Sequence, residues 1–344
     1  MLSGQAPSPT TPISYVRLLL TLCTEHGVPH AQVLAGLGIT DDQLHDPDAR
    51  VSLRPVFSEL CRRALTLTGE PALGYLFGLR AHLTTHGILG YGLMSQPSLR
   101  QVLSFGQQFG TVLRLAAWDL HFQVGDTHAR MWAVDSIPPN DIREFSAQVL
   151  IVSAYSMLAQ LLPACTNDVV LCFDFPEPAY HPAWAHRLPT CRFGAAFNEI
   201  RLPLRYLDMS LHTANPMSAI LAERECSREL SLLDAPRHDD VTRQVRKLLT
   251  LQADQGYPTP ASIAQQLHLS PRTLARQLQT QGSSYRTLLQ EARKRDSRFL
   301  LQDTRLSLAD IAVRLGYESL PGFTRAFQSW YGLTPQAFRL SQPT

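Results

Sequence analysis

The sequence predicts an α+β domain followed by an all-α domain of about seven helices that contains two helix-turn-helix motifs. Three observations support this prediction. One helix-turn-helix pattern occurs twice in the last third of the chain, positive charge gathers in that same third, and residues 113–202 hold strand-like runs between helical segments. The length of 344 residues allows two domains, each with its own core.

The two copies of the pattern are offset by an almost constant spacing. The matching pairs are Ile263 and Ile311 (311−263 = 48), Leu274 and Phe323 (323−274 = 49), and Gly282 and Gly332 (332−282 = 50). The offset between the two copies increases by one residue in each turn, where an inserted residue costs little stability. Solenoids usually need three or more stacked repeats, so two copies do not predict a solenoid.

Each copy has the residues that two steeply crossed helices need. Ala264 and Ala312 are small enough for the crossing point. Ser270 is a good N-cap with Pro271 at the first helical position, and Ser319 has the cap role in copy two. The outward residues of the two second helices are Arg272, Thr273, Ala275, Arg276 and Gln279, and then Leu320, Pro321, Thr324, Arg325 and Gln328. Two ordinary helical hairpins are the alternative, but arginine on both outward faces favours entry into a DNA major groove.

The balance of charge differs between the two parts of the chain. Residues 240–344 hold 14 Lys and Arg against 7 Asp and Glu (14−7 = +7), whereas the remainder holds 17 against 22 (17−22 = −5). A basic module favours a polyphosphate partner, here double-stranded DNA. The basic run 293–298 lies on the predicted connector helix 286–301, and a solvated helix face is its alternative explanation.

The candidate DNA contacts fall into two groups. Base readout is expected from Arg272, Thr273, Arg276, Gln279, Thr324, Arg325 and Gln328. Phosphate contacts and positioning are expected from Ser270, Ser283, Ser319 and Arg293. With the offset of 49, Pro321 and Gly322 replace Arg272 and Thr273 and offer no side-chain hydrogen bond, so copy one is predicted to make most of the base contacts.

The preceding 240 residues predict helices first and mixed structure afterwards. Residues 13–112 are predicted to form short amphipathic helices split by Gly and Pro. The later predicted elements are strands at 113–120, 121–124 and 128–134 around a turn at 125–126, a helix capped by Asp141 and ending at 162, strands at 169–175 and 199–202, a helix at 216–233, and a polar linker at 234–240.

Residues 262–339 resemble the DNA-binding domain of AraC/XylS-type bacterial transcription regulators. The most specific stretch is SLADIAVRLGYESLPGFTRAFQSWYGLTPQAFR, residues 307–339, with its Ile-Ala pair, Leu-Gly-aromatic triplet, Phe-x-Arg-x-Phe, Gly-x-x-Pro and terminal aromatic-Arg. Copy one fits more loosely, because His268 lies where many such motifs have Gly. Pro321 and Gly322 are further departures, at positions where polar residues often face bases.

The N-terminal part resembles the arabinose-binding-like effector domain of one AraC-type subfamily. The resemblance rests on His86-Gly87, Leu89-Gly90-Tyr91 and Pro97-Ser98-Leu99 within residues 73–114, and on CRFGAAFNEIRLPLRYLD at 191–208. It implies a transcription regulator and favours an activator, with a repressor as the alternative. It also implies an unknown small-molecule effector, promoter DNA and RNA polymerase as partners, and no cofactor. The subfamily label does not make arabinose the ligand.

These resemblances divide the chain into a disordered tail (1–12), an effector domain (13–210), a helical linker and dimer element (211–240) and a DNA-binding domain (241–344). The candidate effector-pocket residues are His86, Trp118, Trp132 and Tyr155, together with the aromatic Phe122 and Phe173. The alternative is that the aromatic residues are core and that the histidine is structural. Ile220, Leu221, Leu230 and Leu233 are candidates for a homodimer contact, with packing on their own domain as the alternative.

Other functional classes find little support in the sequence. Six scattered cysteines without CxxC spacing predict neither a zinc site nor a disulfide scaffold, but reduced thiols in the cytoplasm. No signal peptide or membrane span is predicted, and no nucleotide loop, HExxH or GxSxG occurs. No catalytic residue is assigned. The remaining alternative is an enzyme with its pocket in residues 13–210 and a helical interaction tail.

Overall fold

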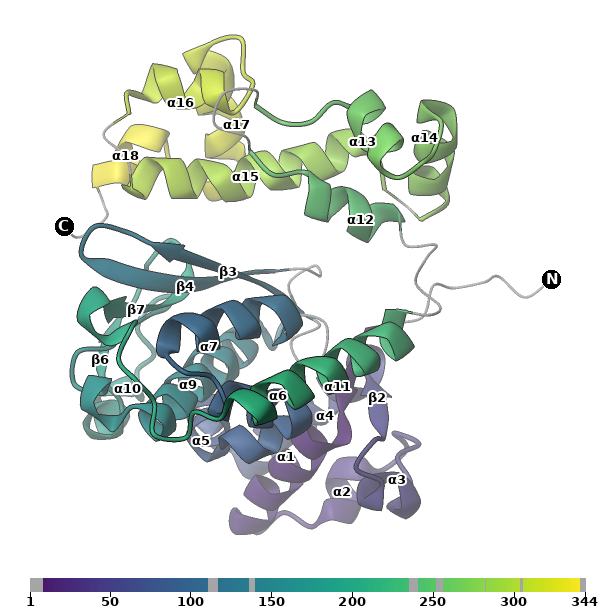
Figure 1. Ribbon diagram of the computed structural model, residues 1–344, viewed down its shortest axis with the longest axis vertical. Helices are drawn as coiled ribbons and strands as arrows, with labels where there is room; N and C mark the ends of the chain where they lie inside the picture. Colours follow the sequence, from purple (N-terminus) through teal and green to yellow (C-terminus); the bar gives the residue numbers. More distant parts are fainter. Residues whose placement is uncertain are drawn as a thin grey trace. The chain divides into compact units, whose positions relative to one another are not determined.

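The computed structural model describes residues 9–110, 117–135, 140–234, 241–251, 256–281, 283–303 and 306–340. The chain forms two compact units, Ser8–Ala235 and Pro236–Thr344 (Figure 1). Among the residues described, no helix combines the length and the apolar character needed to cross a membrane.

The first unit opens with a small helical subdomain closed by a strand pair. Its elements are β1 (Thr10–Pro12), α1 (Ile13–Glu25), α2 (His30–Leu34), α3 (Asp41–His45), β2 (Arg50–Ser52) and α4 (Ser58–Thr68). β1 and β2 pair antiparallel, with Thr11 opposite Val51. The prediction of a structureless tail through residue 12 is therefore wrong for Thr10–Pro12, and β2 interrupts the helical run predicted for 13–112. Residues 1–8 lie outside the described part of the chain.

A layer of helices follows and packs around one long buried helix. Its members are α5 (Leu73–Arg80), α6 (Gly87–Met94), α7 (Leu99–Phe105) and α9 (Arg143–Leu161), and α5 packs along α9 (Figure 1). The predicted helix 141–162 is thus confirmed, but Asp141 does not cap it. The N-cap residue is Ile142, and Asp141 instead accepts hydrogen bonds from Arg62 at 2.6 and 2.9 Å.

One five-stranded sheet packs on this layer, in the order β3-β4-β7-β5-β6. Its strands are β3 (Trp118–Val124), β4 (His128–Asp135), β5 (Val170–Cys172), β6 (Thr190–Arg192) and β7 (Asn198–Pro203), and all pairs are antiparallel except β5–β6. The predicted strands 121–124, 128–134 and 199–202 are confirmed, and 169–175 shortens to β5. Residues 113–116 of the first predicted strand lie outside the described residues, and β6 was not predicted.

Alternation along the strands gives the sheet two different faces. Ala129, Met131 and Ile200 point toward α9, where they line a cavity. Arg130 and Glu199 lie on the opposite face and form a buried ion pair of 3.2 Å between Nε and Oε2. The charge of Arg130 is therefore compensated on the face away from the cavity.

The first unit ends in α11 (Pro216–Asp234), as the sequence predicts. The Asn215 side chain accepts a hydrogen bond from the Ser218 backbone N–H at 3.0 Å and caps the helix start. α11 packs on α6, and Ala222 and Cys226 are its fully buried residues. The predicted linker beyond Asp234 lies outside the described residues.

The second unit is all-α. Its described helices are α12 (Val241–Leu248), α13 (Pro260–Gln266), α14 (Pro271–Thr280), α15 (Tyr285–Asp303), α16 (Leu308–Arg314), α17 (Leu320–Tyr331) and α18 (Pro335–Leu340). These seven helices agree with the predicted number. α15 connects the two motifs and packs against helices of both halves.

All six cysteines are free thiols, and five of them are buried. Burial raises the pKa of Cys23 to about 11 and that of Cys172 to about 12. Because the thiolate is the reactive form, these buried thiols are chemically inert near neutral pH.

Candidate nucleic-acid interface and effector cavity

The first helix-turn-helix is formed by α13 and α14. Thr259 caps α13 by accepting from the Ser262 N–H, and Ser270 caps α14 by accepting from the Thr273 N–H at 3.1 Å. The fully buried residues that hold the two helices together are Ile263, Ala264, Leu274 and Leu278. The predicted N-cap and core of copy one are therefore confirmed, whereas Gly282 lies outside the described residues.

The second motif is formed by α16 and α17 with the same design. Ser307 and Asp310 form a reciprocal capping box at the start of α16, and Ser319 caps α17 through the Gly322 N–H at 3.4 Å. The buried residues are Ile311, Ala312, Leu315, Phe323 and Phe327. An aromatic cluster extends this core, with the Phe327 ring 4.7 Å from that of Tyr331 and 5.3 Å from that of Phe338. The core of copy two is thus aromatic where that of copy one is aliphatic.

The arginines predicted to read bases lie on the outer faces of the two second helices. Arg272, Arg276 and Arg325 are exposed, and within the described residues their guanidinium groups have no ion-pair or hydrogen-bond partner. Gln279 and Gln328 are exposed on the same faces, whereas Thr273 and Thr324 are half-buried. The geometry therefore leaves one arginine–glutamine pair accessible on each helix, plus Arg272 on the first.

The four residues predicted to contact phosphate have different surroundings. The hydroxyls of Ser270 and Ser319 are used as helix caps, so they lie at the positive ends of the recognition helices. The backbone N–H of Ser283 donates to Leu278 O at 2.9 Å. Arg293 on α15 donates from Nη2 to Gly316 O at 2.7 Å, and its guanidinium lies 4.7 Å from the Tyr317 ring centre. Arg293 thus holds the turn of the second motif.

The two turns reach the same backbone conformation with different residues. His268 has φ +55° and Gly316, its equivalent (268+48), has φ +74°. A left-handed conformation costs a residue with a Cβ roughly 1–2 kcal/mol. At Gly316 a Cβ would also lie 2.9 Å from Arg293 Nη2, so a side chain there meets both backbone strain and a steric conflict.

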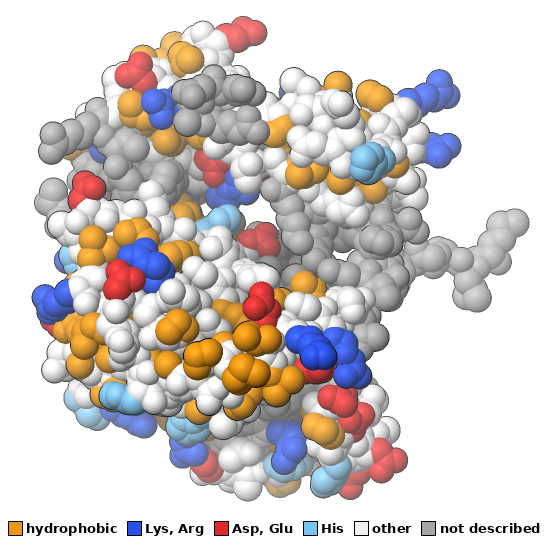
Figure 2. Space-filling view, viewed as in Figure 1, with side chains coloured by type: hydrophobic (Ala, Val, Ile, Leu, Met, Phe, Trp, Pro, Cys, Tyr) orange, Lys and Arg blue, Asp and Glu red, His pale blue; other side chains and the backbone are white. Residues whose placement is uncertain are grey.

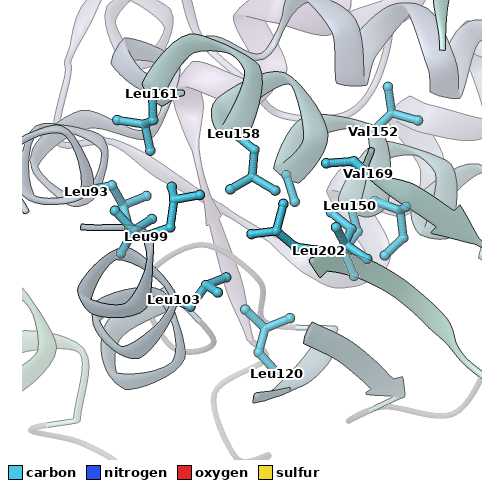
Figure 3. Packing of buried hydrophobic residues seen from close by; sticks show 14 of the residues in the cluster. Leu93, Leu99, Leu103, Leu120, Leu150, Val152, Leu158, Leu161, Val169 and Leu202 are labelled. Atoms are coloured by element: carbon cyan, nitrogen blue, oxygen red, sulfur yellow. The ribbon is translucent and has the colours of Figure 1, made fainter. Parts of the chain in front are cut away.

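A cavity of about 110 Å³ lies inside the first unit, between α9, the sheet, α6 and α7. Its walls are mostly aliphatic, and Leu103, Leu120, Leu158 and Leu202 lie around this space in Figure 3. The lining residues with polar side chains are Tyr15, His86 and Ser153, together with Arg130, whose side chain is directed to the opposite face of the sheet.

The four predicted pocket residues are not brought together. His86 lines this cavity, with Nδ1 2.7 Å from the Tyr15 hydroxyl. Trp118 lines a second cavity of about 70 Å³ beside Arg143. Trp132 stacks on His121 on the other face of the sheet, at 5.2 Å between ring centres. Tyr155 packs against the core and lines neither of these two cavities. The grouping of these residues around one pocket is therefore wrong, because alternation and helix phase separate them.

Two polar residues of the cavity, Tyr15 and Ser153, were not predicted from the sequence. Tyr15 comes from α1 and lies 71 positions from His86 in the sequence. Ser153 is buried in the middle of α9, and its hydroxyl has no hydrogen-bond partner among the described residues. The sequence did mark Ser153, because it is a polar residue within an otherwise apolar helix. Burying such a hydroxyl costs free energy unless it has a hydrogen-bond partner.

The predicted dimer element divides into two faces. Leu230 and Leu233 pack against the core of their own unit, whereas Ile220 and Leu221 are 61% and 50% exposed. With Met217, 75% exposed, they form a hydrophobic surface that Tyr91 of α6 extends (Figure 2). We call these four exposed residues the α6–α11 surface.

Comparison with known proteins decides the family. A family model described as the arabinose-binding domain of AraC transcription regulator, N-terminal, matches residues 27–211, and a helix-turn-helix domain model matches residues 263–341. The chain belongs to the AraC family of transcription regulators.

Two AraC-type relatives and one solved structure illustrate the match. The ornithine utilization regulator of Pseudomonas aeruginosa is 32% identical over 329 residues, which cover 95% of this chain and 96% of that protein. An uncharacterized HTH-type transcriptional regulator of Mycobacterium tuberculosis is 27% identical, with 97% and 98% covered. The crystal structure of the transcriptional regulator CdpR from Pseudomonas aeruginosa is 21% identical, with a TM-score of 0.48 over 95% of this chain and 98% of that one. The two family models and the 32% identical relative confirm the predicted AraC family, and the two compact units confirm the two-part fold.

Proposed function

We propose that this AraC-family regulator is an effector-controlled activator that binds promoter DNA with both helix-turn-helix motifs. The observation that supports this most is the matched exposure of Arg276 and Arg325. Each lies in the second turn of its helix, six residues after the N-cap, and the buried core residues lie on the opposite side of that helix. Bidentate contact of arginine with guanine is the commonest specific contact in the major groove.

Both recognition helices are proposed to enter the major groove on one face of the duplex. Their centres would then be about one helical turn apart, roughly 34 Å. The positive N-terminal ends of α14 and α17, with Ser270 and Ser319 as caps, would receive backbone phosphates. Ser283 and Arg293 are proposed to assist there, the latter through the turn that it holds.

Footprinting of the full chain on the DNA next to its own gene tests this arrangement. We expect two protected segments about ten base pairs apart on one face, and an affinity that falls steeply with salt because phosphate neutralisation releases counterions. Protection spaced by half a turn, or an affinity indifferent to salt, contradicts the proposal. Transcription with purified RNA polymerase then tests activation, since an activator raises initiation from the bound promoter and a repressor lowers it.

The α6–α11 surface is proposed to pair with the same surface of a second copy in the cytoplasm. A two-fold symmetric contact needs a self-complementary patch, and a row of apolar residues satisfies this condition. Sedimentation of Ile220→Lys against Thr21→Lys tests the contact, because both changes add one positive charge to an exposed helical position and Thr21 lies on α1, outside this surface. We expect only Ile220→Lys to give monomers, and dimers of both variants would exclude this surface.

A further inference from the structure

The cavity beside α9 differs from an ordinary packing defect in having polar groups at defined places. Most of its wall is aliphatic, and the two methionines that line it, Met131 and Met157, are flexible enough to adapt to an occupant. Ser153 brings a buried hydroxyl into this wall, and the Tyr15–His86 hydrogen bond lies in the wall as well. Ligand sites of proteins combine these features, apolar walls with a few placed polar groups.

The size of the cavity limits what it can hold. An apolar cavity of about 150 Å³ is known to take up benzene, so a volume of about 110 Å³ suits roughly five to eight non-hydrogen atoms after small side-chain adjustments. A long lipid chain does not fit this space.

The charge around the cavity limits the ligand further. Among the described lining residues, the arginine is Arg130, but its side chain lies on the opposite face of the sheet, where it is paired with Glu199 at 3.2 Å. A carboxylate or ammonium group would therefore enter without a counterion, at a high desolvation cost. A sugar would bring more hydroxyls than Ser153, Tyr15 and His86 can satisfy.

The cavity is also connected to the end of the unit. Leu89 and Leu93 of α6 line it, and the same helix packs on α11. Gly92 of α6 lies between α7 and α11, since a Cβ on Gly92 would be 2.5 Å from the Phe105 ring and 3.2 Å from the Ala222 Cβ. α6 is therefore in tight contact with the cavity on one side and with α11 on the other. α11 ends at Asp234, directly before the second unit. No comparable link is seen for the smaller cavity beside Trp118, whose described wall contains no residue of α6 or α11.

We propose that this cavity is the effector site and that it takes a small neutral molecule, one ring or a short hydrocarbon chain with a single hydrogen-bonding group. The inference rests on the proposed effector control and specifies its ligand class. The hydrogen-bonding group of the ligand lies against Ser153, with Tyr15 and His86 next to it, and the hydrocarbon part lies among Leu158, Leu202 and the methionines.

Calorimetric titration of the full chain without DNA tests the site, with phenol and benzene as probes and erythritol as a polar molecule of similar size. We expect saturable binding of one phenol per chain, weaker binding of benzene and none of erythritol. Ser153→Ala should weaken phenol about threefold to tenfold, the effect of one hydrogen bond, and leave benzene unchanged. Ser156→Ala is the matched control, because Ser156 lies on the same helix, bonds to Leu79 O and does not line the cavity; it should change neither.

Ala154→Phe should abolish binding of both aromatic probes by filling the space, and its thermal melting shows whether it folds. If it does not fold, the Ser153→Ala comparison still decides the proposal. Absence of phenol binding, equal loss in Ser153→Ala and Ser156→Ala, or erythritol binding as tight as phenol would each overturn it. These results are independent of DNA recognition, because footprinting in the absence of phenol, benzene and erythritol tests DNA recognition by itself.

Discussion

The two helix-turn-helix motifs have one backbone design, yet their recognition helices begin differently. The first begins Ser270, Pro271, Arg272, Thr273, and the second begins Ser319, Leu320, Pro321, Gly322. Aliphatic side chains fill the first core, while rings fill the second and reach α18. We propose a division of labour in which the first motif contacts more bases and the second has the more stable core. The following predictions test that division.

The largest effects are expected in the two cores. Leu278→Ala should lower the free energy of unfolding of the second unit by about 2–5 kcal/mol, and Phe327→Ala by about 3–5 kcal/mol, through lost burial and the cavity left behind. Amide hydrogen exchange, resolved for each helix, measures both variants. The exposed Gln328→Ala is the control, and its free energy of unfolding should change by no more than about 0.5 kcal/mol. If Phe327→Ala raises exchange in α14 as much as in α17, the halves do not fold as separate cores and the comparison loses its basis.

Next come the arginines on the outer faces. Arg276→Ala and Arg325→Ala should each weaken specific DNA binding by about 1–3 kcal/mol and relax one base position. Arg272→Ala should have an effect of the same kind, whereas Pro321→Ala at the equivalent place should change affinity by less than about 0.5 kcal/mol. Selection of binding sites from random DNA measures the information under each helix. Equal information under both would show that the asymmetry at the helix starts does not matter for readout.

The glycine of the second turn should matter more for stability than for readout. Gly316→Ala should lower the free energy of unfolding by about 1–2 kcal/mol, because φ is +74° and the new Cβ would approach Arg293 Nη2. Urea denaturation of the full chain measures the effect, with amide hydrogen exchange in α16 and α17 as the observable. Combining Gly316→Ala with Arg293→Met separates the two causes, since the double variant keeps only the backbone strain. An unchanged stability in Gly316→Ala would contradict both causes, the backbone strain and the approach of the new Cβ to Arg293.

The smallest effect is expected at the equivalent place in the first turn. His268→Gly should raise stability by less than about 1 kcal/mol, because relief of the strain at φ +55° is partly offset by the greater entropy of glycine in the unfolded chain. His268→Ala is the control, since it keeps the strained Cβ and should not stabilise. A loss of DNA affinity in His268→Gly without a loss of stability would instead assign the exposed imidazole to the interface.

The sequence was sufficient for the motifs because every contact that defines them is local. The caps, the small residues at the crossing and the buried pairs such as Leu274 and Leu278 lie within twenty positions of one another. The cavity is different, since Tyr15, His86 and Ser153 meet only after α1, the turn before α6, and α9 have packed. Aromatic content suggested Trp118, Trp132 and Tyr155 instead, and no sequence pattern told which face of the sheet or helix each would occupy. The three-residue strands β2 and β6 are likewise too short for alternation to be visible.

The connector helix α15 has a consequence for the DNA sites themselves. Its 19 residues span about 28 Å, and one residue inserted or deleted within it would move the second motif by about 1.5 Å and turn it by about 100°. A change of one residue would therefore remove the second motif from the face of the duplex that the first one occupies. A change of four residues would nearly restore that face, but at a spacing about two base pairs different. If both motifs occupy one face of the duplex as proposed, the number of residues in this one helix sets the spacing between the half-sites. A promoter should then tolerate a base change under either motif better than a change in the distance between them.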